Sequence, residues 1–264
     1  MWVKTEDAGS GVVVVKLNDP KRRNAMTRDM GMALRDTFDG LSERAGLRSV
    51  VLTGAPPAFS AGGDLGMLED LGQRTREEGF DATQTMLEFY DLFLSIRRVP
   101  VPVVGAINGH AVGAGACIAL ATDLRVIASD CKFGLNFAKL GLHPGMGGTW
   151  LLPQAVGPQR AAELLYTGRL ASGSEMHAYG AALASLPAEE VLPRALDLAK
   201  DVAASSPVVC RQMKRTLQGE RGLSEQLQLE AECQAVNYGT EDLQEGLSAI
   251  RQRRMPKFAD PGGA

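Results

Sequence analysis

The 264-residue sequence has no long apolar run and no strong excess of one charge. No apolar stretch is long enough to span a bilayer. The N-terminal residues show neither the hydrophobic segment of a signal peptide nor the arginine-rich composition of a transit peptide. The net charge of −3 argues against the basic surface that nucleic acids and anionic membranes require. We therefore expect a cytoplasmic protein that binds neither nucleic acid nor membrane.

Cysteine and histidine are also scarce. Three scattered histidines and four cysteines without a C-x-x-C pair predict no metal site. Disulfides are not expected in a reducing compartment, so the thiols should be free and mostly buried. The cysteines are Cys117, Cys131, Cys210 and Cys233.

Hydrophobic patterning predicts an α/β core followed by a helical region. A chain that is 45% hydrophobic and 22% charged is ordinary for a globular protein, and this one is long enough to bury a full core. Residues 64–80 are polar and interrupted by glycines, which predicts a mobile segment. Strands are expected at residues 11–17, 50–53, 101–107 and 183–186. Helices are expected at residues 28–44, 81–98, 147–156, 159–167 and 174–182 and from residue 189 onward. This order predicts a core at residues 1–195 and a C-terminal helical region at residues 196–264.

The stretch at residues 102–148 carries the first chemical signal. An apolar strand is broken at Asn108-Gly109, and a glycine-rich turn at residues 113–116 leads into a small apolar helix. Such a turn brings backbone N–H groups without partners to a helix N-terminus, where negative oxygen is held well.

A second stretch has the same design. The strand at residues 50–54 is followed by a turn at residues 58–65 that runs into another helix start. Two donor-rich turns suggest two N–H groups that converge on one oxygen, as in an oxyanion hole for an enolate or a tetrahedral intermediate. The glycines could equally serve only tight turns and close packing.

Together the two segments resemble the crotonase (enoyl-CoA hydratase/isomerase) family, whose oxyanion segments read F-S-A-G-[AG]-D-[LI] and N-G-x-A-x-G-[AG]-G. They stand here at residues 59–65 and 108–115, and the likeness extends from residues 18–26 to residues 251–258. The resemblance implies a spiral α/β core, a C-terminal helical region with trimer contacts, and a homotrimer or homohexamer. It also implies an acyl-CoA substrate, with CoA as part of the substrate and no separate cofactor. Its oxyanion donors map onto the amides of Gly63 and Ala114.

The resemblance also assigns a CoA-binding face. Lys21, Arg22 and Arg23 occupy the segment before the first helix, where cations would face a polyphosphate. A solvated basic turn is the alternative. Two positions that reach the CoA of a neighbouring subunit map onto Ile250 and Arg253, although isoleucine replaces an aromatic residue. The other positions expected to bind substrate are Ala25, Ala61, Asp64, Leu65, Phe137 and Gly145.

The familiar acid positions of the family are not occupied by acids. Hydratases use two glutamates for proton transfer, and these positions hold Cys117 and Phe137 here. The acid position of the P-E-G isomerases holds Gly145. Cys117 could act only with a strongly lowered pKa, which the helix dipole would favour. The sequence therefore predicts a very poor hydratase.

Three readings of the chemistry follow. Acid–base groups could have moved to His110 or His143, which titrate near neutral pH unless they only cap backbone or pack under a loop. A decarboxylase would need no base at a C–H bond, although the basic residue of such family members has no counterpart after Gly63. A non-catalytic acyl-CoA binding protein is the third. A Cys117–His110 dyad for thioester hydrolysis would need contact between the two side chains, which their spacing in the sequence does not impose. A dinucleotide site is a poorer interpretation, because the glycines at residues 113–115 lack the required spacing.

Overall fold

A six-stranded sheet forms the centre of the computed structural model, which describes residues 1–75, 78–219, 241–252, 254 and 256–258. The strand order is β1-β2-β3-β5-β7-β10. β1 runs antiparallel to β2, and the four following strand pairs are parallel. The strands are β1 (Val3–Asp7), β2 (Val12–Leu17), β3 (Ser49–Gly54), β5 (Val103–Ile107), β7 (Leu124–Ala128) and β10 (Ala184–Leu186).

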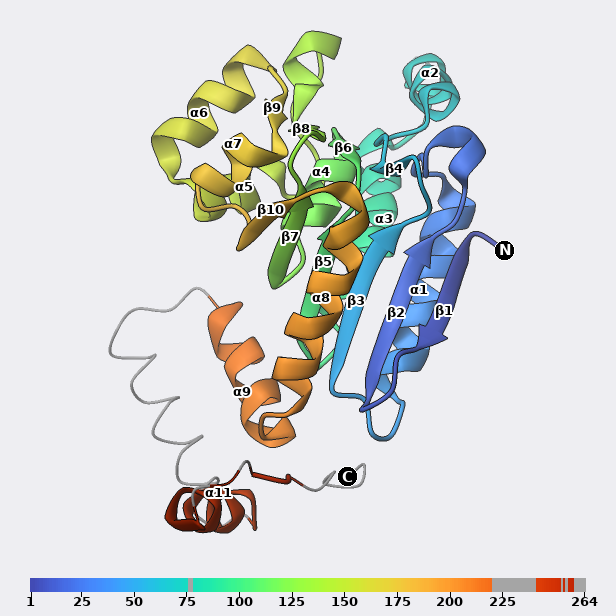
Figure 1. The fold of residues 1–264 in the computed structure, drawn as a ribbon. Helices are drawn as coiled ribbons and strands as arrows, with labels where there is room; N and C mark the ends of the chain where they lie inside the picture. The colour runs from blue at the N-terminus through green and yellow to red at the C-terminus, as the bar shows by residue number, and fades with distance from the viewer. Residues whose placement is uncertain (76–77, 220–240, 253, 255, 259–264) are drawn as a thin grey trace.

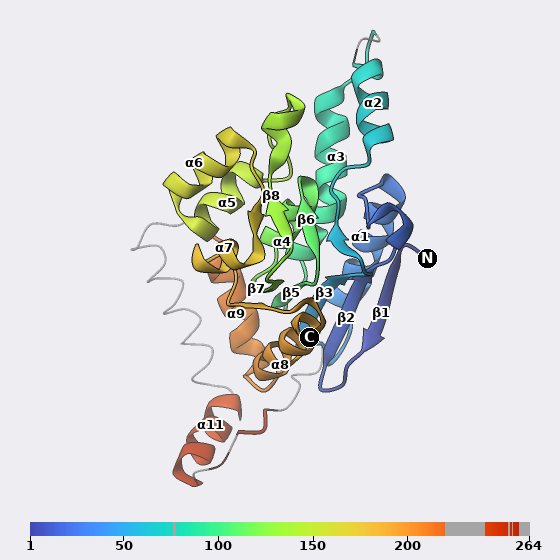
Figure 2. The ribbon, with the colours of Figure 1, turned by 45° about the horizontal axis from the view of Figure 1, so that its top comes forward.

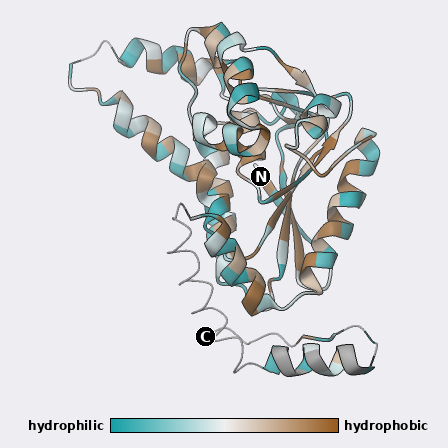
Figure 3. Cartoon of the chain, turned by 90° about the vertical axis from the view of Figure 1, so that its left-hand side faces the viewer, coloured by the Kyte–Doolittle hydropathy of each residue, from teal (hydrophilic) through white to brown (hydrophobic). Residues whose placement is uncertain are grey.

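Helices cover both faces of this sheet, which explains its apolar strands. β3 and β5 are buried along their whole lengths, as parallel strands covered on both faces usually are. Figure 1 shows α8 (Ala188–Ala203) in front of the sheet, with α1 (Arg28–Ser42) and α3 (Ala82–Leu94) behind it. Hydrophobic residues predominate on the central strands between these layers (Figure 3).

A second, four-stranded sheet has the order β4-β6-β8-β9. The consecutive pairs β3/β4, β5/β6 and β7/β8 each place one strand in each sheet. The helix α4 (Ala114–Leu120) follows β6, and all seven of its residues are buried. The strands are β4 (Ala58–Ser60), β6 (His110–Val112), β8 (Lys132–Gly134) and β9 (Ala171–Ser172). This repeated crossing between sheets brings the ends of β4 and β6 side by side, because the two strands are parallel neighbours.

The remaining helices follow the predicted order. The predicted α/β core with C-terminal helices is confirmed, and α1 begins after Thr27, whose hydroxyl accepts a hydrogen bond from the Met30 N–H at 3.3 Å. Three short 3₁₀ helices are η1 (Pro20–Arg22), η2 (Ser95–Arg97) and η3 (Asn136–Leu140). The other α-helices are α2 (Leu65–Arg74), α5 (Gly148–Val156), α6 (Pro158–Thr167), α7 (Gly173–Ala178), α9 (Pro207–Leu217) and α11 (Glu241–Gln252).

Residues 64–80 were expected to open with a helix start and to be mobile; the helix start is confirmed, and the mobility stays a prediction. They contain α2, which begins after Asp64, and the Asp64 carboxylate accepts a hydrogen bond from the Met67 N–H at 3.1 Å. This cap and the apolar residues of the helix outweigh the two glycines inside it. The predicted domain boundary after residue 195 falls inside α8, and the division into two units stays a prediction.

The described residues lack two features, a membrane-spanning helix and a cluster of metal ligands. No helix in them is long and apolar enough to cross a membrane. They also contain no group of three or more histidine, cysteine, aspartate or glutamate side chains that could hold a metal ion.

Candidate active site

A cavity of about 420 Å³ lies where β4 and β6 end. Helices α2 and α3 extend beyond β6 at the top of Figure 2, and both contribute to the cavity wall. Residues 61, 63 and 112–114 line the cavity, so the two glycine-rich segments meet at one place. Its apolar side chains are those of Leu65, Met67, Leu68, Leu71, Met86, Phe89, Val112, Phe137, Leu140, Leu142 and Met146.

The predicted oxyanion donors both line this cavity. Ala114 is the first residue of α4, where a backbone N–H has no partner within the helix. Gly63 pairs with Met26 in an isolated bridge, but the bridge uses the Gly62 carbonyl and the Asp64 N–H. Within the described part of the chain, neither the Gly63 nor the Ala114 amide donates a hydrogen bond. Both residues therefore line the cavity with a backbone amide that makes no hydrogen bond to the described protein.

Two glycines allow the segments to come this close. Gly62 has a φ of +91°, and a Cβ there would collide with the Val112 carbonyl oxygen. A Cβ on Gly115 would lie 2.5 Å from the Ser60 carbonyl oxygen. The glycines thus serve close packing, and that packing is what places the two amides on a common cavity.

No aspartate or glutamate is among the described residues that line the cavity. Cys117 is fully buried and does not line it, and its thiol donates a hydrogen bond to the Gly145 carbonyl oxygen at 3.4 Å. Burial raises the pKa of the Cys117 thiol to about 12, so the thiol is protonated at neutral pH. The lowered pKa that Cys117 would have needed to act in proton transfer is not supported, because desolvation of the thiolate outweighs any effect of the helix dipole.

The positions at which the family resemblance places acids are filled in different ways. The Phe137 ring lines the cavity, and its Cζ would lie 4.0 Å from a Cβ on Gly113. Gly145 also lines it, and the Tyr90 hydroxyl from α3 occupies the space that a side chain on Gly145 would need. Tyr90 was not identified as a site residue from the sequence, since its helix carried no motif.

The two candidate histidines have different surroundings. His110 is exposed at the start of β6, and its Nδ1 accepts the Lys132 N–H at 3.0 Å. It does not line the cavity, so neither a catalytic His110 nor a Cys117–His110 dyad is supported. His143 does line the cavity, and its Nδ1 lies 2.8 Å from the Pro144 carbonyl oxygen.

The basic segment at residues 21–23 is tied to the first oxyanion turn. The Arg23 carbonyl accepts the Ala61 N–H at 2.9 Å, and Ala61 lines the cavity. Arg22 pairs with Asp19 at 2.6 Å, and its guanidinium lies 5.0 Å from the centre of the Trp2 ring. All three basic residues are exposed, and in the described structure Lys21 and Arg23 form no ion pair.

Asn24 holds this segment in place and was missed from the sequence. Its buried side-chain amide donates to the Ala55 and Ala58 carbonyls, both at 2.8 Å. Its φ of 54° is a left-handed conformation, which asparagine tolerates better than most residues. The asparagine residue type itself was therefore the signal that the sequence offered.

The remaining predicted binding residues are spread around the site. Leu65 lines the cavity, whereas Ala25 is buried and Asp64 caps α2 without lining it. The Ile250 side chain and Arg253 lie outside the described residues.

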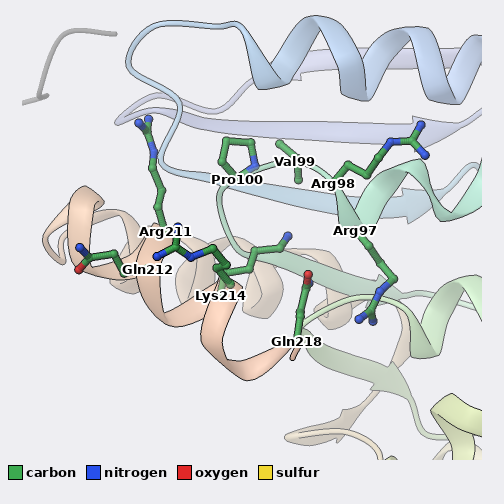
Figure 4. Close-up of a pocket in the computed structure, with 9 residues that line it drawn as sticks. Arg97, Arg98, Val99, Pro100, Arg211, Gln212, Lys214 and Gln218 are labelled. Atoms are coloured by element: carbon green, nitrogen blue, oxygen red, sulfur yellow. The ribbon is translucent and has the colours of Figure 1, made fainter. Parts of the chain in front are cut away.

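A larger hollow of about 640 Å³ lies between η2 and α9 (Figure 4). It is basic, and the buried Lys214 in its wall pairs with Asp123 at 3.0 Å. Neither oxyanion amide lines this hollow, so the smaller cavity is the candidate active site. The basic residues that line it are Arg97, Arg98, Arg211, Lys214 and Arg215.

Comparisons with known proteins agree with this fold. The profile of the enoyl-CoA hydratase/isomerase family matches residues 7–261. A Thermus thermophilus protein provisionally named an enoyl-CoA hydratase is 37% identical over 249 residues, which are 94% of this chain and 97% of that protein. The 1,2-epoxyphenylacetyl-CoA isomerase of Escherichia coli is 33% identical over 251 residues, covering 94% of this chain and 95% of that protein. The crystal structure of an enoyl-CoA hydratase from Polaromonas sp. JS666 matches with a TM-score of 0.89 at 30% identity, covering 97% of this chain and 99% of that chain.

A two-sheet α/β fold of this kind, with paired glycine-rich segments at one cavity, is shared by a family of hydratases and isomerases. The chain belongs to this family, the enoyl-CoA hydratase/isomerase (crotonase) family, along nearly its whole length.

Proposed function

We propose that the protein acts on an acyl-CoA thioester by holding its carbonyl oxygen, as an enolate, between the amides of Gly63 and Ala114. The observation that carries this proposal is the pair of amides without partners facing one apolar cavity. Preorganised N–H donors in an apolar site stabilise developing negative charge strongly, because little water competes for them.

Efficient hydration is not the reaction we propose. Adding water across a double bond needs one group to deprotonate the water and another to manage the proton at the α-carbon. Phe137 has no acceptor for such a water, and the pKa of Cys117, raised by burial to about 12, prevents its thiol from acting as a base. Each missing acid or base costs roughly 10²–10⁴-fold in rate.

The CoA part of the substrate is proposed to lie along residues 21–23. The hydrogen bond from Ala61 to Arg23 places this basic segment at the edge of the oxyanion turn. The predicted homotrimer or homohexamer belongs to the same proposal, and a monomeric mass in light scattering at micromolar concentration would contradict it. The predicted cytoplasmic location stays a prediction.

Decarboxylation is the second candidate. Loss of CO₂ from a β-carboxyl or vinylogous acyl thioester leaves the enolate directly, so no base is needed at a C–H bond. The apolar cavity without a described carboxylate favours this reaction, because it solvates a substrate carboxylate poorly. Asp64 and Leu65 follow Gly63, so the basic partner used by similar family members is missing at that point.

A mass-spectrometric screen of acyl-CoA thioesters in D₂O tests both candidates. The panel includes crotonyl-CoA, saturated acyl-CoA and β-carboxyacyl-CoA thioesters. Uptake of deuterium at the α-carbon reports an enolate, and loss of CO₂ with uptake of deuterium reports decarboxylation. Hydration of crotonyl-CoA at a rate typical of the family would overturn the proposal. Tight binding without any conversion would favour the non-catalytic alternative.

A further inference from the structure

The Tyr90 hydroxyl is one of a few polar side-chain groups in the wall of a mainly apolar cavity, together with those of Thr75, Asn136 and His143. Tyr90 lies on α3 and is half-buried in the cavity wall. A Cβ on Gly145 would overlap its hydroxyl oxygen and would lie 2.9 Å from its Cζ. The hydroxyl thus stands where the acid of the P-E-G isomerases would begin, although it comes from a different part of the chain.

Two of the emptied acid positions are close to this hydroxyl. The Cys117 thiol binds the Gly145 carbonyl at 3.4 Å, and Cys117 interacts electrostatically with Tyr90. Tyr90 therefore lies beside the hydratase position at 117 and the isomerase position at 145.

The Tyr90 hydroxyl is also free to donate a hydrogen bond to a bound substrate. Buried tyrosines usually find a partner for their O–H group. Among the residues that the structure describes, the half-buried Tyr90 hydroxyl makes no hydrogen bond, so it is open to a ligand in the cavity. Burial, and then the neighbouring Cys117, raises the pKa of Tyr90 above its ordinary value of 10.0, so the phenol is protonated at neutral pH. It can act as a donor but not as a base.

We infer that Tyr90 is a catalytic proton donor to the enolate carbon. This inference rests on the proposed function and deepens it. The electron pair of the enolate C=C bond takes the phenolic proton, and the O–H bond breaks to leave a phenolate. The phenolate then takes a proton from water, which leaves hydroxide in solution. The enolate that Tyr90 protonates is formed by decarboxylation: the C–C bond to the substrate carboxylate breaks, its electron pair becomes part of the enolate C=C bond, and CO₂ leaves.

The test is Tyr90→Phe, with Tyr166→Phe as the matched control. Both remove one hydroxyl, but Tyr166 is 84% exposed on α6 and does not line the cavity. The assay uses an acyl-CoA that wild type converts in D₂O and measures kcat, KM and the stereochemistry of deuterium at the α-carbon. We expect kcat to fall by roughly 10²–10⁴-fold in Tyr90→Phe with little change in KM. Deuterium should also arrive on both faces, because solvent replaces a donor fixed on one face.

A second variant changes Gly145, the residue that lies against the same hydroxyl. Gly145→Ala would push the Tyr90 ring aside, so it should show the same loss of kcat and of stereochemical selectivity. Thermal unfolding of each variant checks that the fold survives. An active wild type whose Tyr90→Phe variant keeps its kcat or its one-sided deuteration overturns the role of Tyr90 alone. A wild type that incorporates no deuterium into any acyl-CoA overturns the proposed function, and this inference with it.

Discussion

Replacing Ala114 by proline removes one N–H group from the cavity with little change to the fold. Ala114 is the first residue of α4, and its N–H makes no hydrogen bond in the described structure. Proline suits the first position of a helix, because its φ is held near about −65° and the missing N–H has no helical partner. The protein already uses this arrangement, since Pro158 and Pro207 begin α6 and α9. We expect the free energy of unfolding to change by less than about 1 kcal/mol.

Turnover should respond far more than stability. Loss of one oxyanion donor costs roughly 10²–10³-fold in kcat, or about 2.7–4 kcal/mol in the barrier. The assay is steady-state conversion of the acyl-CoA found in the mass-spectrometric screen, with affinity measured separately by calorimetry. Because the donor acts mainly on the enolate, the affinity for substrate should change much less than kcat.

Gly63 offers a matched pair of controls for the second donor. Gly63→Pro removes the N–H, whereas Gly63→Ala keeps it and has room, since the nearest atom to the new Cβ would be a Leu68 methyl at 3.9 Å. We expect the proline variant to lose as much turnover as Ala114→Pro and the alanine variant to lose little. A folded Ala114→Pro protein with wild-type turnover would refute the donor assignment. Equal losses in the two Gly63 variants would mean that the loss is steric.

Three further predictions concern packing, pH and CoA binding. Gly115→Ala should lower stability by about 1–3 kcal/mol and lower turnover, because its Cβ would lie 2.5 Å from the Ser60 carbonyl oxygen; a wild-type denaturation midpoint would contradict this. Stability should fall as pH rises above 9, because burial raises the pKa of Cys117 from 9.0 to about 12, and the unfolded chain therefore loses this proton first. Each pH unit in that window costs on the order of 1.4 kcal/mol, and urea titrations that show the same slope in Cys117→Ala would dismiss the thiol as the cause. Alanine at residues 21–23 should weaken acyl-CoA binding and its dependence on salt, and unchanged titrations would remove this segment from the site.

Local patterns predicted most of the secondary structure in the described chain. The strand at residues 11–17 and the helix at residues 28–44 were confirmed as β2 and α1, because alternation, helical spacing and a Thr27 cap are read from neighbouring residues. The helix start expected after residues 58–65 was confirmed as α2, which begins after the Asp64 cap, although the glycines of this segment hid how far the helix extends. The mobility expected at residues 64–80 stays a prediction.

The positions of single side chains in the site were harder to predict. His110 precedes the oxyanion turn in sequence, but β6 carries the chain from His110 to the cavity, and its ring binds the Lys132 backbone instead. Tyr90 lies 55 residues from Gly145, and only the packing of α3 against the loop after η3 brings them together. The separation of two such residues along the sequence does not indicate the distance between their side chains in the structure.

By itself, the sequence determined the family, the main helices, four of the ten strands in the described chain, and two turns whose glycines leave N–H groups without partners. Those features depend on short-range geometry, which residue type and spacing control directly. The tertiary structure alone decided that both turns face one cavity, that the Cys117 thiol is buried and protonated, and that a phenol occupies the place of a missing acid. Burial and proximity arise from packing between distant segments, and the protonation state and role of a side chain follow from that packing.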